Sequence, residues 1–276
     1  MDDDVLGYNS KRVIVTGCAS GMGEAAARIL IDLGAEVHGI DVKEPSLEGL
    51  AGYQATDLRE PDQIKAAVDG IGGEVDALFN CAGLPTTFPD LDVMLVNFCG
   101  LRELTELVVG HMNDGAGIVN IASVAGAGWL MKQATIMELV NAPDFAAARD
   151  WCKANVTDGS SYSVSKEAIN AYTALRGYQL APRGIRMNCV NPGPTDTPMM
   201  PAFIETSGQE FFDNFPKPIG RNARPEEQAW ALVLVNSPRS SYLMGQNIFV
   251  DGGFMAGMQT GQIDPAALQP AGGQDA

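Results

Sequence analysis

The sequence has only two histidines, His38 and His111, and its five cysteines are scattered without the close spacing of a metal site. Isolated histidines offer almost nothing to a zinc centre or to a His-dependent catalytic triad. An odd number of dispersed cysteines also argues against a disulfide framework, so we expect reduced thiols that fill small spaces in the core. We therefore expect no metal. The cysteines are Cys18, Cys81, Cys99, Cys152 and Cys189.

Basic residues and long apolar runs are also scarce. Eighteen Lys and Arg stand against thirty-four Asp and Glu, which gives a net charge of −16. A field of that sign repels nucleic acid and anionic lipid. No apolar run is long enough to span a bilayer, and the start Met1-Asp2-Asp3-Asp4 is unlike the basic start of a targeting peptide. We expect a cytoplasmic protein that binds neither nucleic acid nor membranes.

The composition is that of a globular protein: 276 residues, 46% hydrophobic and 19% charged. Candidate strands and helices alternate along the chain, which predicts an α/β fold with a doubly wound, Rossmann-type parallel sheet flanked by helices. We expect a single domain over residues 1–256 and a Gly/Gln/Pro/Ala-rich tail over 257–276 with nothing periodic to bury. The candidate strands are 12–16, 36–41, 77–79, 117–121, 185–190 and 246–250, and the candidate helices are 22–33, 61–70, 91–112, 161–180 and 225–236.

A glycine-rich turn joins the first candidate strand to the first candidate helix. It runs Thr16-Gly17-Cys18-Ala19-Ser20-Gly21-Met22-Gly23. Glycines permit a tight reversal there and let a pyrophosphate approach the backbone, while the helix N-terminus supplies free N–H groups. The turn alone is a weak signal, but its position between strand and helix indicates a dinucleotide site.

Asp41 ends the second candidate strand, 18 residues after Gly23, about where a carboxylate binds the adenosine ribose hydroxyls. A 2′-phosphate would meet a like charge there, and Lys43 is the only nearby cation. This predicts NAD rather than NADP. The alternative is that Asp41 merely caps the turn before Pro45.

Further along the chain, several short motifs follow in order, each at the end of an expected element. Together they resemble the short-chain dehydrogenase/reductase family from Arg12 to about Gly253. The motifs are the Thr16 to Gly23 turn, Asn80-Cys81-Ala82-Gly83, Asn97, Ser123, Tyr162-Ser163-Val164-Ser165-Lys166 and Asn191-Pro192-Gly193.

The resemblance implies a catalytic set of Asn97, Ser123, Tyr162 and Lys166. Residues four apart share a helix face, so Tyr162 and Lys166 can reach one cofactor. A nearby ammonium and an oxidised nicotinamide would lower the pKa of the phenol toward the working range. Ser123 would hold the substrate oxygen, and Asn97 would bind a water in a proton relay. The alternatives are that Ser123 caps a strand, that Asn97 satisfies a helix carbonyl, and that Tyr162 and Lys166 form an exposed pair.

The resemblance also implies cofactor contacts outside the glycine turn. Asp57 and Leu58, expected at the end of a third strand, would contact adenine, and Asn80, Ala82 and Gly83 would line the adenosine side. Lys166 would hold the nicotinamide ribose. The segment with Pro192, Gly193, Thr195 and Thr197 would receive the nicotinamide carboxamide.

Residues 127–159 form an insertion between Ser123 and Tyr162 that is too long for a plain loop. Its apolar pattern on both sides of Pro143 predicts two short amphipathic helices. An insertion here resembles the 3α-hydroxysteroid dehydrogenase/carbonyl reductase branch of the family, and it lies beside both the substrate entrance and the helix through which family tetramers associate. We expect a homodimer or a homotetramer.

The substrate expected is a hydrophobic secondary alcohol or its ketone, such as a hydroxysteroid or an alicyclic terpenoid alcohol. Apolar residues after the carboxamide segment could cover such a molecule, although the same side chains fill any core. A non-catalytic NAD(H)-binding sensor or scaffold, and a reductase of sugars or acyl thioesters, are the alternatives. The apolar residues are Met199, Met200, Phe203, Ile204, Phe211, Phe212 and Phe215.

Overall fold

The structure is a computed structural model that describes residues 4–264. Seven parallel strands form one sheet in the order β3-β2-β1-β4-β5-β6-β7. The inner strands are continuous apolar runs because both faces of a parallel sheet are covered. The strands are β1 (Arg12–Thr16), β2 (Glu36–Asp41), β3 (Gly52–Ala55), β4 (Val75–Asn80), β5 (Met112–Ile121), β6 (Arg186–Pro192) and β7 (Asn247–Val250).

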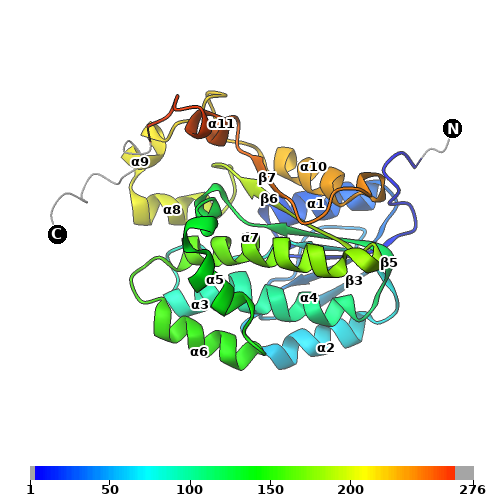
Figure 1. Cartoon of the computed structure of the whole chain (residues 1–276). Coiled ribbons are helices and arrows are strands. Elements are labelled where there is room, and N and C mark those ends of the chain that lie inside the picture. The colour runs from blue at the N-terminus through cyan, green and yellow to red at the C-terminus, as the bar shows by residue number, and fades with distance from the viewer. Residues whose placement is uncertain (1–3, 265–276) are drawn as a thin grey trace.

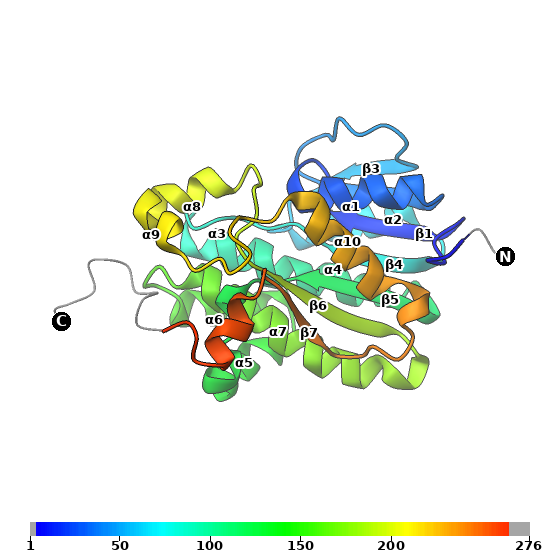
Figure 2. The same ribbon diagram turned by 90° about the horizontal axis from the view of Figure 1, so that it is seen from above.

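Helices cover both faces of the sheet (Figures 1 and 2). α1 and α10 pack on one face, and α2, α4 and α7 pack on the other, so the apolar core forms two layers. The strand order reverses between β1 and β4, which is where open α/β sheets bind ligands. The predicted doubly wound fold is confirmed. These helices are α1 (Gly21–Asp32), α2 (Pro61–Ile71), α4 (Leu101–Val109), α7 (Ser161–Leu180) and α10 (Pro225–Asn236).

The helix predicted at 91–112 is present, but it contains a π-helical turn and ends at Val109. α3 (Asp90–Met94) passes into a π-helical turn, η1 (Leu95–Gly100), and α4 ends at Val109 before β5 begins at Met112. A Cβ at Gly100 would collide with the carbonyl oxygen of Leu58, so η1 packs directly against the chain that leads into α2. Such a turn depends on tertiary contacts, which the apolar periodicity of the helix does not reveal, and it often marks a functional site.

The third strand ends earlier than expected. β3 stops at Ala55, so Asp57 and Leu58 lie in the following turn. The Asp57 carboxylate accepts hydrogen bonds from the backbone N–H of Arg59 at 2.9 Å and from its guanidinium at 2.6–3.0 Å. An aspartate that binds the backbone two residues on stabilises a turn in place of a strand. The same guanidinium holds the pKa of Asp57 below its usual range.

The insertion contains the two predicted helices, α5 (Gln133–Val140) and α6 (Phe145–Asn155), after a 3₁₀ turn, η3 (Trp129–Lys132). α5 packs against α7, and α6 packs against α3 and η1 (Figure 1). Ile136, Leu139 and Cys152 are completely buried in the main core, so these helices form part of the folded domain. Lys132 also pairs at 3.2 Å with Glu167, a carboxylate only 4% exposed on α7.

After β6, the chain forms α8 (Met200–Ser207) and α9 (Gln209–Asn214), and it ends the described part with α11 (Phe254–Gln259). All three helices lie at one end of the molecule (Figures 1 and 2). α11 extends into the predicted tail, which is therefore helical at its start; residues 265–276 lie outside the described residues. Within residues 4–264, no helix combines the length and the apolar character needed to cross a membrane. The domain boundaries stay predictions.

Candidate active site

Three glycines shape the turn from β1 to α1. Gly17 and Gly21 adopt φ angles of +68° and +61°, which favour glycine. A Cβ at Gly23 would collide with the carbonyl of Gly17, so the turn cannot be this tight with a larger residue. Ser20 is extended and precedes the helix, and the first N–H groups of α1, from Gly21 and Met22, have no acceptor within the helix. These N–H groups lie at the positive end of the helix dipole and therefore suit a phosphate.

The loop after β4 closes the glycine turn from the other side. Thr16 Oγ1 accepts hydrogen bonds from the N–H groups of Cys81 and Ala82, both at 3.0 Å. A Cβ at Gly83 would lie 3.3 Å from Asn97 Oδ1 and 3.9 Å from Lys166 Nζ. This loop therefore joins the phosphate-facing turn to the predicted catalytic residues. Thr16 was not among the predicted site residues, although its position at the end of a buried strand was a usable signal.

Asn80 lies in the same region, but its side chain points into the protein. Its amide Nδ2 donates to Thr105 Oγ1 and to Asn120 Oδ1, both at 2.9 Å, and the residue is 2% exposed. Only the backbone of Asn80 is therefore available to line an adenosine pocket.

Asp41 reaches into the glycine turn from the end of β2. One carboxylate oxygen accepts from the Ala19 N–H and the other from the Lys43 N–H, both at 3.0 Å. Asp41 therefore does more than cap the turn before Pro45, because it also binds the glycine-rich turn. Burial raises the pKa of the neighbouring Cys18 thiol to about 12, and the charge of Asp41 adds to this shift. A fixed negative charge stands where the second ribose of a dinucleotide would lie.

α7 and β5 bring together three of the predicted catalytic residues. Lys166 is 4% exposed, its Nζ donates to the Ile121 carbonyl at 3.0 Å, and it lies 5.4 Å from the centroid of the Tyr162 ring. Ser123 caps the 3₁₀ turn η2 (Val124–Gly126), where its Oγ accepts from the Ala125 N–H at 3.2 Å, and its hydroxyl lies close enough to the Tyr162 phenol to lower the pKa of that group. The alternative of an exposed Tyr/Lys pair is therefore wrong.

Burial controls the protonation of this pair. It raises the pKa of Tyr162 to about 12, which the hydrogen bond of Ser123 opposes. It lowers the pKa of Lys166 to about 8, which the thiols of Cys189 and Cys81 oppose. The amine of Lys166 lies over the ring and donates to a carbonyl; the expected lowering of the Tyr162 pKa by this amine together with an oxidised nicotinamide stays a prediction. Two perturbed groups that face each other are typical of a catalytic site.

Asn97 lies in η1 and is completely buried. Its Oδ1 accepts from the Leu84 N–H at 2.7 Å, and its Nδ2 donates to the Leu84 carbonyl at 3.1 Å and to Ser165 Oγ at 3.3 Å. Ser165 in turn donates to the Tyr162 carbonyl at 2.7 Å. Asn97 therefore holds a loop and the start of α7 together, and the alternative that it satisfies a helix carbonyl is wrong.

The segment after β6 lies against the glycine turn. Pro192 ends β6, and a Cβ at Gly193 would approach the Asp251 backbone to 3.0 Å. Thr195 Oγ1 donates to the Gly193 carbonyl at 2.9 Å. Thr197 lies 3.5 Å from where a Cβ of Gly21 would be, so this segment reaches the N-terminus of α1.

α8 covers the phenol. The ring of Phe203 contacts that of Tyr162 edge-on, with centroids 4.9 Å apart and an interplanar angle of 73°. Thr206 on α8 and Thr86 in the loop after β4 share a hydrogen bond of 2.7 Å between their hydroxyls. α8 thus bridges the two sides of the candidate site.

The aromatic residues of α9 pack elsewhere. The rings of Phe211 and Phe212 lie 5.2 Å apart, Phe211 also contacts Phe215, and Phe215 contacts Phe254 of α11 at 4.8 Å. This cluster supports α9 against α11. Of the phenylalanines that were expected to cover the substrate, Phe203 is the one whose ring contacts a predicted catalytic residue, Tyr162.

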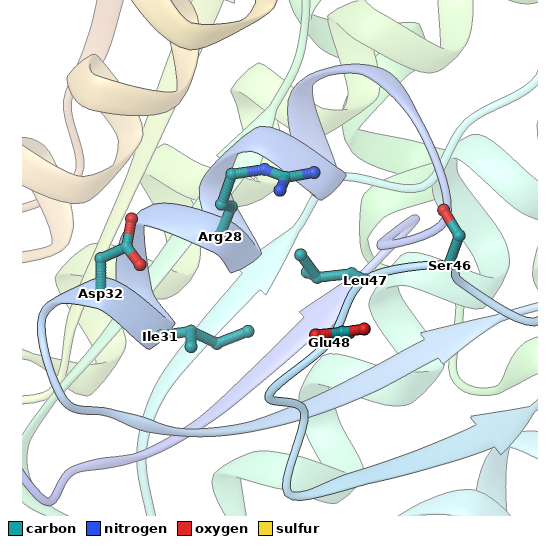
Figure 3. A pocket seen from close by; sticks show the side chains of 6 residues that line it. All are labelled: Arg28, Ile31, Asp32, Ser46, Leu47 and Glu48. Carbon is teal, nitrogen blue, oxygen red and sulfur yellow. The ribbon is translucent and has the colours of Figure 1, made fainter.

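A cavity of about 320 Å³ lies apart from these residues (Figure 3). It is lined by three residues of α1 and three of the chain before β3, and no predicted site residue lines it. Its lining residues are Arg28, Ile31, Asp32, Ser46, Leu47 and Glu48. Among residues 4–264, no group of three or more His, Cys, Asp and Glu residues is arranged to hold a metal ion.

Comparison with known proteins agrees with this geometry. Residues 11–135 match the family model described as short chain dehydrogenase, and residues 147–255 match that described as Enoyl-(Acyl carrier protein) reductase. The chain is 35% identical over 246 residues to coniferyl-alcohol dehydrogenase of Pseudomonas sp. (strain HR199), covering 88% of this chain and 96% of the relative. It is 29% identical over 261 residues to 3-alpha-hydroxysteroid dehydrogenase/carbonyl reductase of Comamonas testosteroni, covering 91% and 99%.

A solved structure shares the fold as well. The 3-alpha-hydroxysteroid dehydrogenase from Pseudomonas sp. B-0831, complexed with NADH, aligns with a TM-score of 0.77 at 27% identity, covering 92% of this chain and all of that one. The family predicted from the sequence motifs is thereby confirmed. The chain belongs to the short-chain dehydrogenase/reductase family, whose members bind a nicotinamide cofactor, and it is an oxidoreductase that acts on alcohols.

Proposed function

We propose that this chain is an NAD(H)-dependent dehydrogenase that interconverts a hydrophobic secondary alcohol and its ketone. The best substrates are alcohols on an alicyclic ring, such as a hydroxysteroid or a terpenoid. One observation carries the proposal: the half-buried phenol of Tyr162 has the Ser123 hydroxyl beside it and the apolar ring of Phe203 as its cover. A proton-transfer group thus faces an apolar space.

The residues present fit a dinucleotide. A Cβ would fill the cradle at Gly17 and Gly23, and the N-terminus of α1 faces that cradle. Asp41 would hold the adenosine ribose, and its charge would oppose the 2′-phosphate of NADP. The relative from Pseudomonas sp. B-0831, complexed with NADH, agrees with this preference. When bound, the nicotinamide supplies hydride transfer.

The remaining proposed cofactor contacts divide between the two halves of the dinucleotide. Asp57, Leu58, Ala82, Gly83 and the backbone of Asn80 would line the adenosine half. Pro192, Gly193, Thr195 and Thr197 would lie beside the carboxamide, with Lys166 on the ribose next to it.

The protein's own part in the reaction is to orient the alcohol and move its proton. The Ser123 hydroxyl would hold the substrate oxygen beside Tyr162, whose phenolate would accept the hydroxyl proton during oxidation and whose phenol would return it during reduction. Lys166 and Asn97 would connect this proton to solvent. Because burial alone favours the neutral phenol, the positive charge of an oxidised nicotinamide would favour the phenolate.

The surface over the site argues for an uncharged substrate. α8 and α9 expose Glu205, Glu210 and Asp213. Lys217, which follows them, donates to the Phe212 carbonyl at 2.7 Å. Exposed carboxylates on these two helices, together with the net charge of −16, repel phosphorylated sugars, CoA thioesters and the acidic acyl carrier protein. A neutral ring alcohol meets no such barrier.

A second candidate is a primary allylic alcohol on an aromatic ring. The relative that is 35% identical is named coniferyl-alcohol dehydrogenase. The edge-on ring of Phe203 would suit a flat aromatic substrate as well as an alicyclic one. The acid/base chemistry of Tyr162 would be the same for both.

A substrate screen tests the proposal. The purified protein is mixed with NAD or NADP and with 3α-hydroxysteroids, cyclic terpenoid alcohols, coniferyl alcohol, aldoses and 3-hydroxyacyl thioesters, while the absorbance of the reduced cofactor is followed. The proposal expects turnover with NAD on ring alcohols. Turnover on coniferyl alcohol alone would favour the second candidate, and NADH binding without turnover on any compound would favour a sensor or scaffold.

We expect a cytoplasmic homodimer or homotetramer. The insertion helix α5 covers part of α7, whereas β7 is an edge strand and α10 exposes Trp230 and Leu234 by 45% and 50%. Pairing through α10 and β7 would bury both side chains. Light scattering gives the oligomeric state, and a shift of the mass toward monomer in Trp230→Glu would support this surface.

A further inference from the structure

Asn170 lies on α7 one helical turn after Lys166 and two turns after Tyr162, so the three residues share a face of the helix. It is 1% exposed. No sequence motif marks it, because its partners lie far away in the chain. The hydrogen bonds of its side chain, however, reach two segments that carry the candidate site.

The Asn170 amide joins α7 to two of these segments. Its Nδ2 donates to the Gly126 carbonyl at 3.0 Å and to Asn191 Oδ1, also at 3.0 Å. Gly126 ends the turn η2 that begins directly after Ser123. Asn191 precedes Pro192 at the end of β6. One NH₂ group thus holds together the helix of Tyr162, the turn of Ser123 and the strand that leads to the carboxamide segment.

Only a hydrogen-bond donor can serve at this position, because the Gly126 carbonyl oxygen and Asn191 Oδ1 are both acceptors. The other amide atom, Asn170 Oδ1, is buried and has no hydrogen-bond partner among residues 4–264. A buried acceptor without a partner costs stability, and a leucine of similar size would avoid that cost. The asparagine is therefore poorly explained by stability alone and well explained by the two bonds that it donates.

The turn η2 is also built for close approach to α7. A Cβ at Gly126 would lie 2.6 Å from the carbonyl group of Lys166 and 2.8 Å from Asn170 Nδ2. The absence of a side chain lets the backbone of η2 lie directly on the helix, within reach of the Asn170 amide. The register between Ser123 and Tyr162 is thus set at this contact.

We propose that Asn170 is a positioning residue that holds the Ser123 hydroxyl at the Tyr162 phenol. The inference rests on the proposed function, in which the closeness of these two hydroxyls serves catalysis. Without the Asn170 amide, η2 and the Ser123 hydroxyl that caps it are free to move away from α7, and the interaction of Ser123 with the phenol weakens. The Tyr162 phenolate is then harder to form, and the Ser123 hydroxyl holds the substrate oxygen less firmly.

The test replaces Asn170 by leucine and compares it with Asn236→Leu. Asn236 is a matched control: it is 1% exposed, its Nδ2 donates to the Leu78 carbonyl at 3.2 Å, and its Oδ1 also lacks a partner among the described residues. It lies beside Gly117 of β5, six residues before Ser123 in the chain. Both variants remove a buried amide, but only the first removes one that touches η2.

The expected result is a shift of the pH profile in one variant only. For alcohol oxidation, the acid limb of kcat/KM should move to higher pH by about 0.5–1 unit in Asn170→Leu. We also expect kcat/KM at neutral pH to fall about 10- to 100-fold, while the Kd for NADH stays within about threefold. In Asn236→Leu the acid limb of the kcat/KM profile should stay at the wild-type pH. The proposal is overturned if the acid limb does not move in Asn170→Leu, or if it moves equally in both variants.

Hydrogen exchange provides a readout that does not need a substrate. The amides of residues 122–128 should exchange faster in Asn170→Leu than in the wild type, and not in Asn236→Leu; equal exchange in all three proteins contradicts the proposal. If Asn170→Leu does not fold, Asn170→Ser takes its place, because the shorter side chain cannot reach both acceptors. A wild type without turnover would refute the proposed function, and exchange would still decide the role of Asn170.

Discussion

The ring of Phe203 lies edge-on against the ring of Tyr162, with centroids 4.9 Å apart. Phe203 belongs to α8, which follows β6, and Tyr162 lies in the first turn of α7 on the other side of the candidate site. The contact therefore connects the predicted acid/base residue to the segment that covers it. An alcohol that reaches the phenol must pack beside this phenylalanine or displace it.

Phe203→Ala should weaken the binding of a ring alcohol far more than its conversion. Loss of this half-buried phenyl wall costs about 1–3 kcal/mol of apolar contact, which predicts a KM increase of about 5- to 150-fold with a small change in kcat. Steady-state kinetics on the best alcohol of the screen measures both constants. Phe212→Ala is the control, because that ring contacts Phe211. Equal KM values in the two variants would exclude Phe203 from the substrate pocket.

Asp41→Ser should relax the choice of cofactor. The carboxylate is held toward the glycine turn by the Ala19 N–H, and its removal eliminates the charge that opposes a 2′-phosphate. We expect the ratio of kcat/KM for NAD to that for NADP to fall at least about tenfold, equivalent to about 1.4 kcal/mol. Glu48→Gln removes a carboxylate from the separate cavity of Figure 3 and should leave the ratio unchanged. A wild type that prefers NADP would refute this role of Asp41.

Lys166 should make the stability of the protein depend on pH in a defined window. Burial lowers its pKa in the folded state from 10.5 to about 8. Below about pH 8 both states are protonated, and between about pH 8 and 10.5 only the unfolded state keeps the proton. Stability from this group therefore rises with pH across that window, by at most about 1.4 kcal/mol per pH unit.

Urea unfolding of the wild type and of Lys166→Met at several pH values isolates this contribution. The free energy of unfolding of the wild type, minus that of the variant, should be constant from pH 6.5 to 7.5 and should increase from pH 8 to 10. A difference that stays flat across the whole range would show that the amine is not desolvated in the folded protein.

The main elements could be predicted because local signals agree with the tertiary structure. The bounds 161–180 and 225–236 match α7 and α10, and the second of these helices begins with a proline at its first position, where proline is favoured. The π turn around Asn97 could not be predicted, since it depends on the contact between Gly100 and Leu58. The early end of β3 depends on the bonds that Asp57 makes to Arg59.

Some residues of the candidate site could likewise be predicted from the sequence, and others could not. Tyr162 and Lys166 could be placed on one face from helical spacing, and the glycine turn could be identified from its position. Ser165 and Asn170 could not, because their hydrogen bonds to Asn97 and Gly126 connect residues 68 and 44 positions apart. The side-chain direction of Asn80 was equally hidden, since two buried partners on different elements determine it.

The central claim is that the Tyr162 hydroxyl transfers the substrate proton. Tyr162→Phe removes that single oxygen and keeps the ring against Phe203, so the fold and the cofactor cradle should survive. The decisive measurement is kcat of the variant on the best alcohol of the screen, together with its Kd for NADH. The account predicts a fall in kcat of at least about 1,000-fold with a Kd within about threefold of the wild type. A variant that binds NADH normally and turns over at a rate close to the wild type would contradict it.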